Sequence, residues 1–304
     1  MVKILIFISI LIIIAVIMVI IVGWHFSSII IAPKVAKYNY TYDFEVEKGK
    51  IEVEEFNNLE KQEVYLDSNY GYKIHGFFFP NKDSKKIIIL CHGITWSLFG
   101  SVKYMDMFLQ RGFSIFIYDH RNHGLSGGKN TSFGYYEKFD LKKCTDWIFD
   151  KLGKDIIVGL HGESMGAGIA LQNIAIDPRI RFCIDDCGYS DAQDLFKHRL
   201  EKDYNIKKIP LVKLASIISK IRVGWEFKDV SPITTLPTEI PILFIHGEED
   251  DYVPTFMCNQ MYSVKKGYKE IYIAPSAGHA EAYWKNKGEY EKKVDGFLKA
   301  INVI

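Results

Sequence analysis

The stretch His161-Gly162-Glu163-Ser164-Met165-Gly166 constrains the fold of this chain more than any other. It follows a mostly apolar run over residues 155–160 and precedes a segment of small residues over 167–171. This order predicts a strand that ends in a sharp turn and leads into a helix. A Gly-x-Ser-x-Gly pattern at such a junction is typical of a nucleophile elbow, in which the turn exposes the serine hydroxyl and the glycines let strand and helix approach closely. Ser164 is therefore the candidate nucleophile.

The N-terminal segment is the most apolar part of the chain. From Ile4 to Val22 every residue except Ser9 is apolar. As a helix this run would extend roughly 28 Å, close to the thickness of a bilayer's hydrocarbon core. A cleavable signal peptide is the alternative, but the apolar run is longer than usual and no clear small-residue cleavage site follows it. We therefore expect residues 1–31 to be an uncleaved transmembrane anchor, which makes the membrane a partner.

The charges beside the apolar run bear on its orientation. Lys3 favours a cytoplasmic N-terminus, whereas Lys34 and Lys37, just past the run, favour the opposite. Because single N-terminal anchors generally leave the domain that follows outside, we expect that domain on the extracytoplasmic side.

The rest of the chain predicts an α/β fold. Residues 32–60 form a charged connector, and residues 61–304 form the main domain. This domain begins with a hairpin pattern, strands at 63–66 and 73–80. Strand and helix patterns then alternate, with strands at 86–91, 114–119, 155–160, 181–185, 241–246 and 270–274, and helices at about 102–111, 136–151, 165–176, 255–265 and 282–301. Several strands are continuously apolar, so we expect a mostly parallel central sheet with an antiparallel N-terminal edge and helices on both faces.

One segment breaks this alternation. Residues 191–237 contain no clear strand pattern and look helical and basic, which predicts a helical lid inserted over the carboxyl edge of the sheet. Its apolar positions at helical spacing are expected to line an acyl-binding pocket: Leu211, Leu214, Ile218 and Ile221. An ordinary packed helical pair with no role in substrate binding is the alternative.

Composition and charge exclude some classes of function. The 304 residues are 48% hydrophobic, which is ample for a core. A formal net charge of +1 argues against a nucleic-acid partner, since nothing neutralises a row of phosphates. No Cys-x-x-Cys or His-x-x-x-His spacing indicates a metal site.

A serine nucleophile needs a base and an acid that orients it. The apolar run at 242–245 leads into His246-Gly247-Glu248-Glu249-Asp250-Asp251, where four acidic residues compete for the role of the acid. His279 lies in a loop between the last strand and the final helix. The order nucleophile, acid, histidine is the one expected on an α/β sheet, so His279 is the candidate base.

The oxyanion of such a reaction requires backbone N–H donors. Met165 directly follows the candidate nucleophile, and Ile94 lies in the loop after the early strand at 86–91. These two N–H groups are the candidate oxyanion hole.

Together these motifs resemble the α/β-hydrolase superfamily, and within it the lidded serine hydrolases similar to monoacylglycerol lipases and serine aminopeptidases. The loop Asp119-His120-Arg121-Asn122-His123-Gly124-Leu125-Ser126 resembles an Asp-x-Arg-x-His-Gly-x-Ser loop of that group, with Asn122 where glycine is frequent. We expect this loop to be structural, with Arg121 holding loop carbonyls. The resemblance covers about residues 60–302 and, through the spacing His-Gly-x-x-Asp-x-x-Val-Pro, implies Asp250 as the acid. Asp185 and Asp186 are the rivals, because some members keep their acid after that earlier strand.

The resulting expectation is a membrane-anchored serine hydrolase that cleaves carboxylic esters, including lipid-like acyl esters, through Ser164, His279 and Asp250 and without a cofactor. A serine peptidase, an acyltransferase and a non-catalytic anchored binding protein are the alternatives. A peptidase would need acidic groups in the lid to hold a substrate amine, for which Glu201 and Asp203 are available. Because no candidate residue precedes the loop at 91–95, residues 1–31 are expected to be dispensable for activity.

Overall fold

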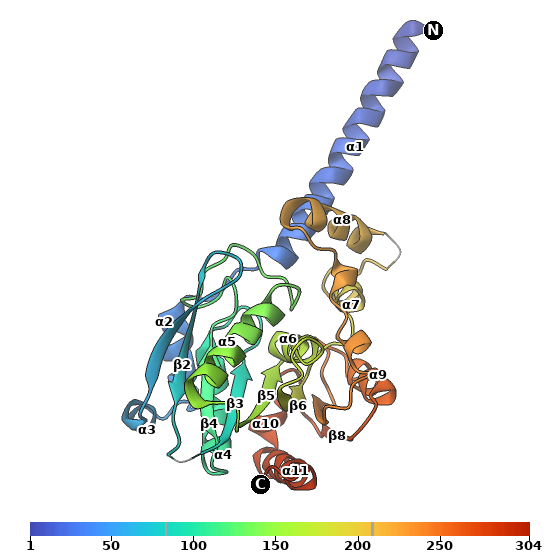
Figure 1. Cartoon of the computed structure of the whole chain (residues 1–304). Helices are drawn as coiled ribbons and strands as arrows, with labels where there is room; N and C mark the ends of the chain where they lie inside the picture. The colour runs from blue at the N-terminus through green and yellow to red at the C-terminus, as the bar shows by residue number, and fades with distance from the viewer. Residues whose placement is uncertain (83, 208–209) are drawn as a thin grey trace.

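The computed structural model describes residues 1–82, 84–207 and 210–304. Its centre is an eight-stranded sheet with the strand order β1-β2-β4-β3-β5-β6-β7-β8 (Figure 1). The strands are β1 Gln62–Asp67, β2 Lys73–Phe79, β3 Lys86–Cys91, β4 Ser114–Tyr118, β5 Ile157–Glu163, β6 Ile180–Asp186, β7 Ile242–Gly247 and β8 Lys269–Ala274. Each predicted strand is present with its ends shifted by three residues at most.

The directions of the strands confirm the predicted fold class. β1 and β2 form the antiparallel hairpin, and β2 pairs antiparallel with β4. All other neighbours run parallel, so the carboxyl ends of the strands from β3 to β8 share one edge of the sheet. The candidate site residues follow β3, β5, β7 and β8, and the sheet topology therefore gathers them at one edge.

Helices cover both faces of the sheet, because the strands are apolar on both sides. In β3, Ile87 and Ile89 face one hydrophobic core while Ile88 and Leu90 face the other. The helices on the first face are α5 Glu137–Leu152, α6 Met165–Asn173 and α9 Phe256–Val264. On the second face lie α2 Tyr38–Glu47, α3 Val53–Asn58, the 3₁₀ helix Leu98–Tyr104, α4 Met105–Leu109, α10 Ala282–Lys285 and α11 Lys287–Ala300. The helices α2 and α3 lie within the segment expected to be a connector.

The insertion over residues 191–237 contains α7 Ala192–Tyr204 and α8 Leu211–Val223, followed by 3₁₀ turns at Phe227–Asp229 and Pro232–Thr235. Residues 208–209 of the insertion lie outside the described residues. Leu211 lines a small cavity, but Leu214 and Ile218 lie against the helix α1, and Ile221 is 78% exposed. The prediction that all four line one pocket is therefore wrong, because α1 crosses α8 and occupies that face.

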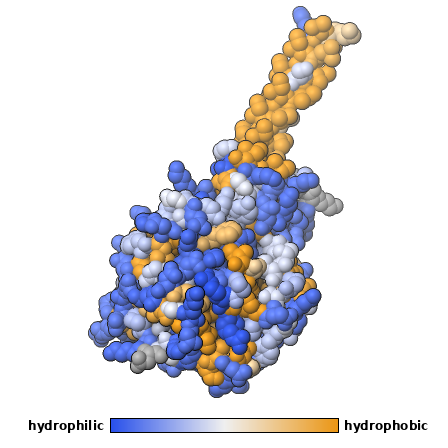
Figure 2. Space-filling view, in the orientation of Figure 1, coloured by the Kyte–Doolittle hydropathy of each residue, from blue (hydrophilic) through white to orange (hydrophobic). Residues whose placement is uncertain are grey.

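The N-terminal helix α1, Val2–Ile31, projects from the body (Figure 1). Side chains 2–22 are exposed and almost all apolar, and Figure 2 shows this part as a hydrophobic rod on a mixed, largely polar body. Within the described residues it is the one helix long and apolar enough to cross a membrane. Its last turns differ, because Gly23, Ser27 and Ile31 are buried against the body. Removal of residues 1–31 would take Ile31 out of the core and with it the carbonyl that accepts the Thr131 N–H, which argues against the expected dispensability.

Candidate active site

Ser164 lies in the sharp turn between β5 and α6, as the pattern predicts. Its φ of 56° and ψ of −116° are strained for a residue with a side chain. The flanking glycines are sterically required: a Cβ on Gly162 would lie 2.4 Å from the Gly166 backbone, and one on Gly166 would lie 2.1 Å from the Cys91 carbonyl oxygen. The first turn of α6 therefore packs directly on the ends of β3 and β5, which fixes the position of the Ser164 hydroxyl.

The structure brings Ser164, His279 and Asp250 together from three separate loops. His279 Nε2 lies 2.9 Å from Ser164 Oγ, and His279 Nδ1 lies 2.7 Å from Asp250 Oδ2. Ser164 is 5% exposed, and Asp250 is buried. A carboxylate, an imidazole and a hydroxyl are thus joined in one hydrogen-bonded chain, the arrangement in which an imidazole can take the proton of a hydroxyl.

Asp250 is held as a carboxylate in one fixed orientation. Burial alone would raise its pKa, but hydrogen bonds from His246 and His279 outweigh burial and hold the pKa well below its usual range. Its Oδ1 accepts the backbone N–H groups of Tyr252 and Val253 at 3.0 and 2.9 Å. Its Oδ2 is thereby left to face the imidazole of His279.

The loop after β3 lies beside the nucleophile. A Cβ on Gly93 would lie 3.7 Å from Ser164 Cβ, and the next residue, Ile94, lines the same pocket as Ser164. Met165 is the first residue of α6, where backbone N–H groups lack intrahelical acceptors. Within the described residues neither Ile94 N nor Met165 N has a hydrogen-bond acceptor. Both predicted oxyanion donors are therefore available to a ligand.

His123, whose contact with this loop the sequence did not reveal, shapes it. His123 Nε2 accepts the Thr95 N–H at 3.0 Å and holds Thr95 at a φ of 65°, directly after Ile94. His123 Nδ1 donates to the Arg121 carbonyl at 2.8 Å, which sets the tautomer. His123 belongs to the loop over 119–126, in which Arg121 Nε donates to the Asn130 carbonyl at 2.8 Å, as expected of a structural loop.

The neighbouring histidines are also buried and neutral. Burial lowers the pKa of all three rings, to about 3 for His120, and the nearby histidines lower it further for His92 and His120. Neutral rings can accept from backbone N–H groups, and His92 Nε2 accepts the His120 N–H at 3.0 Å. These three rings therefore support the backbone of the loops after β3 and β4.

Comparison with known proteins identifies the family. A family profile described as the alpha/beta hydrolase fold matches residues 86–181, which contain β3, the elbow and α6. The uncharacterized protein YqkD of Bacillus subtilis is 38% identical over 287 residues, 93% of this chain and 94% of its own length. The chain belongs to the alpha/beta hydrolase family.

Two more distant proteins extend this result. The Pyrococcus furiosus esterase Pf2001 has the same fold, with a TM-score of 0.68 and 21% identity over 82% of this chain and 94% of that one. An uncharacterized membrane protein of Saccharomyces cerevisiae is 23% identical over 78% of this chain and 81% of its own length. The first similarity shows the fold alone.

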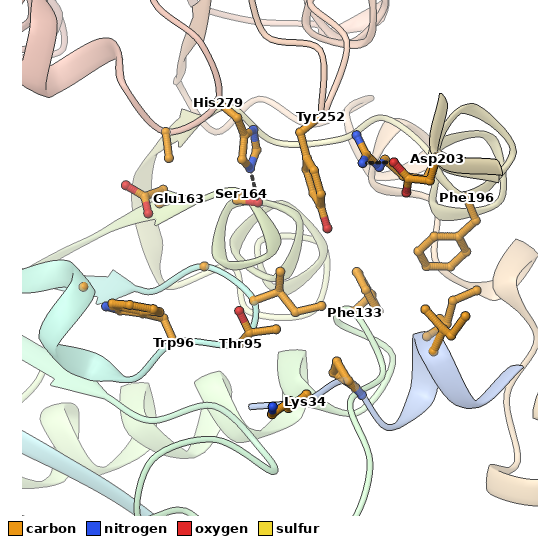
Figure 3. Close-up of a pocket in the computed structure, with 18 of the residues that line it drawn as sticks. Lys34, Thr95, Trp96, Phe133, Glu163, Ser164, Phe196, Asp203, Tyr252 and His279 are labelled. Carbon is orange, nitrogen blue, oxygen red and sulfur yellow. Dashed lines mark hydrogen bonds and ion pairs between the residues drawn. The ribbon is translucent and has the colours of Figure 1, made fainter. Parts of the chain in front are cut away.

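The pocket of this alpha/beta hydrolase has a volume of about 970 Å³ and has Ser164 and His279 in its wall. Figure 3 shows Tyr252 and Phe196 on one side of the serine and Trp96 on the other. Tyr252, which the sequence did not single out, packs on His279 with the ring centroids 4.8 Å apart. Residues Ser28–Ile30 at the end of α1 line the same pocket.

A buried ion pair lies next to the nucleophile, and sequence reasoning missed it as well. The Lys103 ammonium contacts Glu163, the residue before Ser164. Burial would raise the pKa of Glu163, but the positive charge of Lys103 outweighs burial and lowers it. Tyr104 donates from its hydroxyl to Glu163 at 2.6 Å and lies 3.0 Å from Asp186 Oδ2. This network holds Lys103 and Glu163 in the wall of the pocket beside Ser164.

The rival acids do not contact His279. Asp186 Oδ2 accepts the Tyr290 hydroxyl at 3.0 Å and lies 3.0 Å from the Tyr104 hydroxyl oxygen. The Asp185 side chain has no hydrogen-bond partner within the described residues. Burial, and for Asp186 the nearby Glu163, raises the pKa of Asp186 to about 6 and of Asp185 to about 7. These carboxyls are therefore buried groups behind the site that hold a proton more readily than an ordinary aspartate.

The raised pKa of Asp185 predicts a dependence of stability on pH. The folded state keeps a proton that the unfolded state loses above about pH 4, so this group's contribution to the free energy of unfolding falls as pH rises to about 7. The slope is at most about 1.4 kcal/mol per pH unit. Asparagine at position 185 cannot titrate. The free energy of unfolding of Asp185→Asn, measured by urea unfolding at each pH, should therefore rise by a few kcal/mol relative to that of the wild type between pH 4 and pH 8. Asp251→Asn, at an exposed acid, is the control, and parallel curves for both variants would contradict the prediction.

One group of side chains has the elements of a metal site. Donor atoms of Cys187, Asp250 and His279 lie within 4.8 Å of one another. Burial raises the pKa of the Cys187 thiol well above its usual value, so the thiolate that a metal would bind is disfavoured. His279 Nδ1 and Asp250 Oδ2 already bind each other. Asp250 and His279 therefore fit a proton relay with Ser164 better than a metal centre.

Proposed function

We propose that this chain is a serine hydrolase that cleaves carboxylic esters through an acyl-enzyme and is anchored to a membrane by α1. The observation that carries the proposal is the hydrogen-bonded chain from Asp250 through His279 to Ser164, with distances of 2.7 and 2.9 Å. Its position in a pocket large enough for a small organic molecule adds support.

The mechanism follows from this geometry. His279 Nε2 takes the Ser164 proton while Ser164 Oγ attacks the ester carbonyl carbon, and the N–H groups of Ile94 and Met165 hold the resulting oxyanion. His279 then gives the proton to the leaving alcohol as the carbon–oxygen bond breaks. Water, deprotonated by His279, attacks the acyl-enzyme, and the acid leaves as Ser164 regains its proton. Asp250 stabilises the imidazolium in both steps.

The lid favours an ester over a peptide substrate. Holding a substrate amine would require a free carboxylate in the pocket. Asp203 lines the pocket, but its carboxylate is bound by Arg199 (Figure 3). Glu201 pairs with Lys207 at 3.0 Å. The acids that a peptidase would use are therefore already paired.

The anchor rests on the length and composition of α1. Its exposed part over residues 2–22 extends roughly 31 Å as a helix, which matches a bilayer core. A signal sequence is removed, but Ile31 is part of the folded core. The packing of residues 23–31 on the body supports a helix that stays attached.

One labelling experiment tests both parts of the proposal. Membranes from cells that express the full chain are washed at high pH and treated with a fluorophosphonate, which reacts with activated serines. We expect the chain in the washed pellet, with one adduct on Ser164 by mass spectrometry. A chain that is not labelled would refute the hydrolase, and a labelled chain in the supernatant would refute the anchor alone.

A further inference from the structure

The end of α1 is built into the lid. A Cβ on Gly23 would lie 2.6 Å from both Leu214 Cγ and Ile218 Cδ1, so only glycine allows α1 and α8 to cross this closely. One turn further, Phe26 packs edge-to-face on Tyr204 of α7, with centroids 5.2 Å apart. The helix therefore forms a wall of the body over its last two turns.

Arg222 marks the level at which the polar body begins. Its Nη1 donates to the Trp24 carbonyl at 3.2 Å and to Ser28 Oγ at 2.8 Å, and its guanidinium stacks on the Trp24 ring at 4.0 Å. Tryptophan and arginine are the side chains that gather at a membrane–water interface. If the exposed part of α1 spans the bilayer, the membrane surface lies near Trp24. Ile29 and Ile30 then lie roughly 8–9 Å above it, at 1.5 Å per residue.

Two cavities meet at this level. The larger one contains Ser164 and His279, and Ile29 and Ile30 line it. A second cavity of about 90 Å³ lies between α1, α7 and α8, and Ile29, Ile30 and Phe196 line both. The rest of its wall is mainly apolar and includes Phe26, Leu211 and Ala215. We call this second cavity the α1–lid groove.

We infer that the α1–lid groove binds the acyl chain of a membrane-resident ester, whose carbonyl then lies at Ser164. This deepens the proposed function and rests on it.

The charges around the groove favour an apolar, uncharged occupant. Its two charged residues, Arg199 and Asp203, pair with each other, and Arg199 also stacks on Tyr252 at 4.2 Å. An occupant therefore finds no unpaired charge there within the described residues. The opposite end of the large pocket carries Lys103 and Glu163 and suits the polar alcohol part of an ester. A chain that enters from the bilayer surface would reach the groove without crossing this polar end.

The test fills the groove from its α1 wall. The full chain in phosphatidylcholine vesicles is given p-nitrophenyl dodecanoate and p-nitrophenyl acetate, and kcat/KM is measured for each. Each buried methylene contributes about fourfold to binding, so Ile30→Trp, by excluding about three of them, should lower the dodecanoate-to-acetate ratio about 60-fold. Ile20→Trp, on the exposed part of the same helix, is the matched control and should change the ratio less than twofold.

A second variant fills the groove from the opposite wall. Ala215→Trp on α8 should lower the ratio in the same direction, and fluorophosphonate labelling of Ser164 shows that each variant is folded. An unchanged ratio in labelled Ile30→Trp, or equal losses on both esters, would overturn the inference. A wild-type chain that hydrolyses neither ester would refute the proposed function instead. Binding of dodecanol by the wild type but not by Ile30→Trp would then still support the inference that the α1–lid groove binds an alkyl chain.

Discussion

Replacement of Ser164 by alanine should lower kcat for a short p-nitrophenyl ester by about 10⁶, because loss of the nucleophile from such a triad removes nearly all covalent catalysis. The fold should survive, since Ser164 Oγ has His279 as its hydrogen-bond partner and the turn is held by the glycines around it. Steady-state kinetics and circular dichroism measure the two effects.

The control for this substitution is another buried serine. Ser190 lies between β6 and α7, with its hydroxyl 3.2 Å from Gln260, and Ser190→Ala should keep activity within about tenfold of the wild type because it lies outside the hydrogen-bonded chain to Asp250. If Ser164→Ala keeps more than about a hundredth of the wild-type kcat, the acyl-enzyme does not form on Ser164. Catalysis would then come from water activated by His279.

The strands could be predicted because their sequences are compatible with few other secondary structures. Runs such as 87–91 and 242–245 are apolar at every position, which only a strand covered on both faces requires. Short helices were less predictable. The pattern at 102–111 indicated one helix, whereas Ser97 caps a 3₁₀ helix at Leu98 by accepting the Phe99 N–H, and α4 begins only at Met105. Such local hydrogen bonds move the ends of elements without changing the periodicity of the sequence.

Some site residues could also be predicted from the sequence, and others could not. Ser164, Asp250 and His279 follow strands of one parallel sheet, so motif and topology together place them at one edge. Tyr252 and Lys103 matter because of what they contact, and no spacing in the sequence reveals those contacts.

The largest difference concerns the N-terminal helix. Its composition predicts a membrane span but gives no sign that Gly23 meets Leu214, about 190 positions away. The only local signal is a change of character at Gly23, where an unbroken aliphatic run gives way to glycine, tryptophan and serine. A contact between distant segments is decided by their shapes, and the sequence pattern of one segment does not contain it.

Replacement of Asp250 by asparagine should lower kcat by about 10⁴ while KM and the fold change little. The reason is the orientation that the backbone imposes at this position. The N–H groups of Tyr252 and Val253 both point at Oδ1 and need an acceptor there. An asparagine must therefore place its carbonyl oxygen at Oδ1, which puts its NH₂ group opposite His279 Nδ1. The amide then donates to Nδ1, and the ring keeps its proton on Nε2, where it cannot take the proton of Ser164.

Three other aspartates are the controls. Asp251 is adjacent in the same loop but exposed, and Asp185 and Asp186 are the buried rivals at the end of β6. Conversion of each to asparagine should lower kcat by about tenfold or less, because none contacts His279 and charges act weakly at a distance. A loss of order 10⁴ in the kcat of Asp186→Asn or Asp185→Asn would show that the acid that orients His279 lies at the end of β6. In a chain that already carries Ser164→Ala, Asp250→Asn should lower kcat almost no further. The reason is that Asp250 acts only on the transfer of the Ser164 proton to His279.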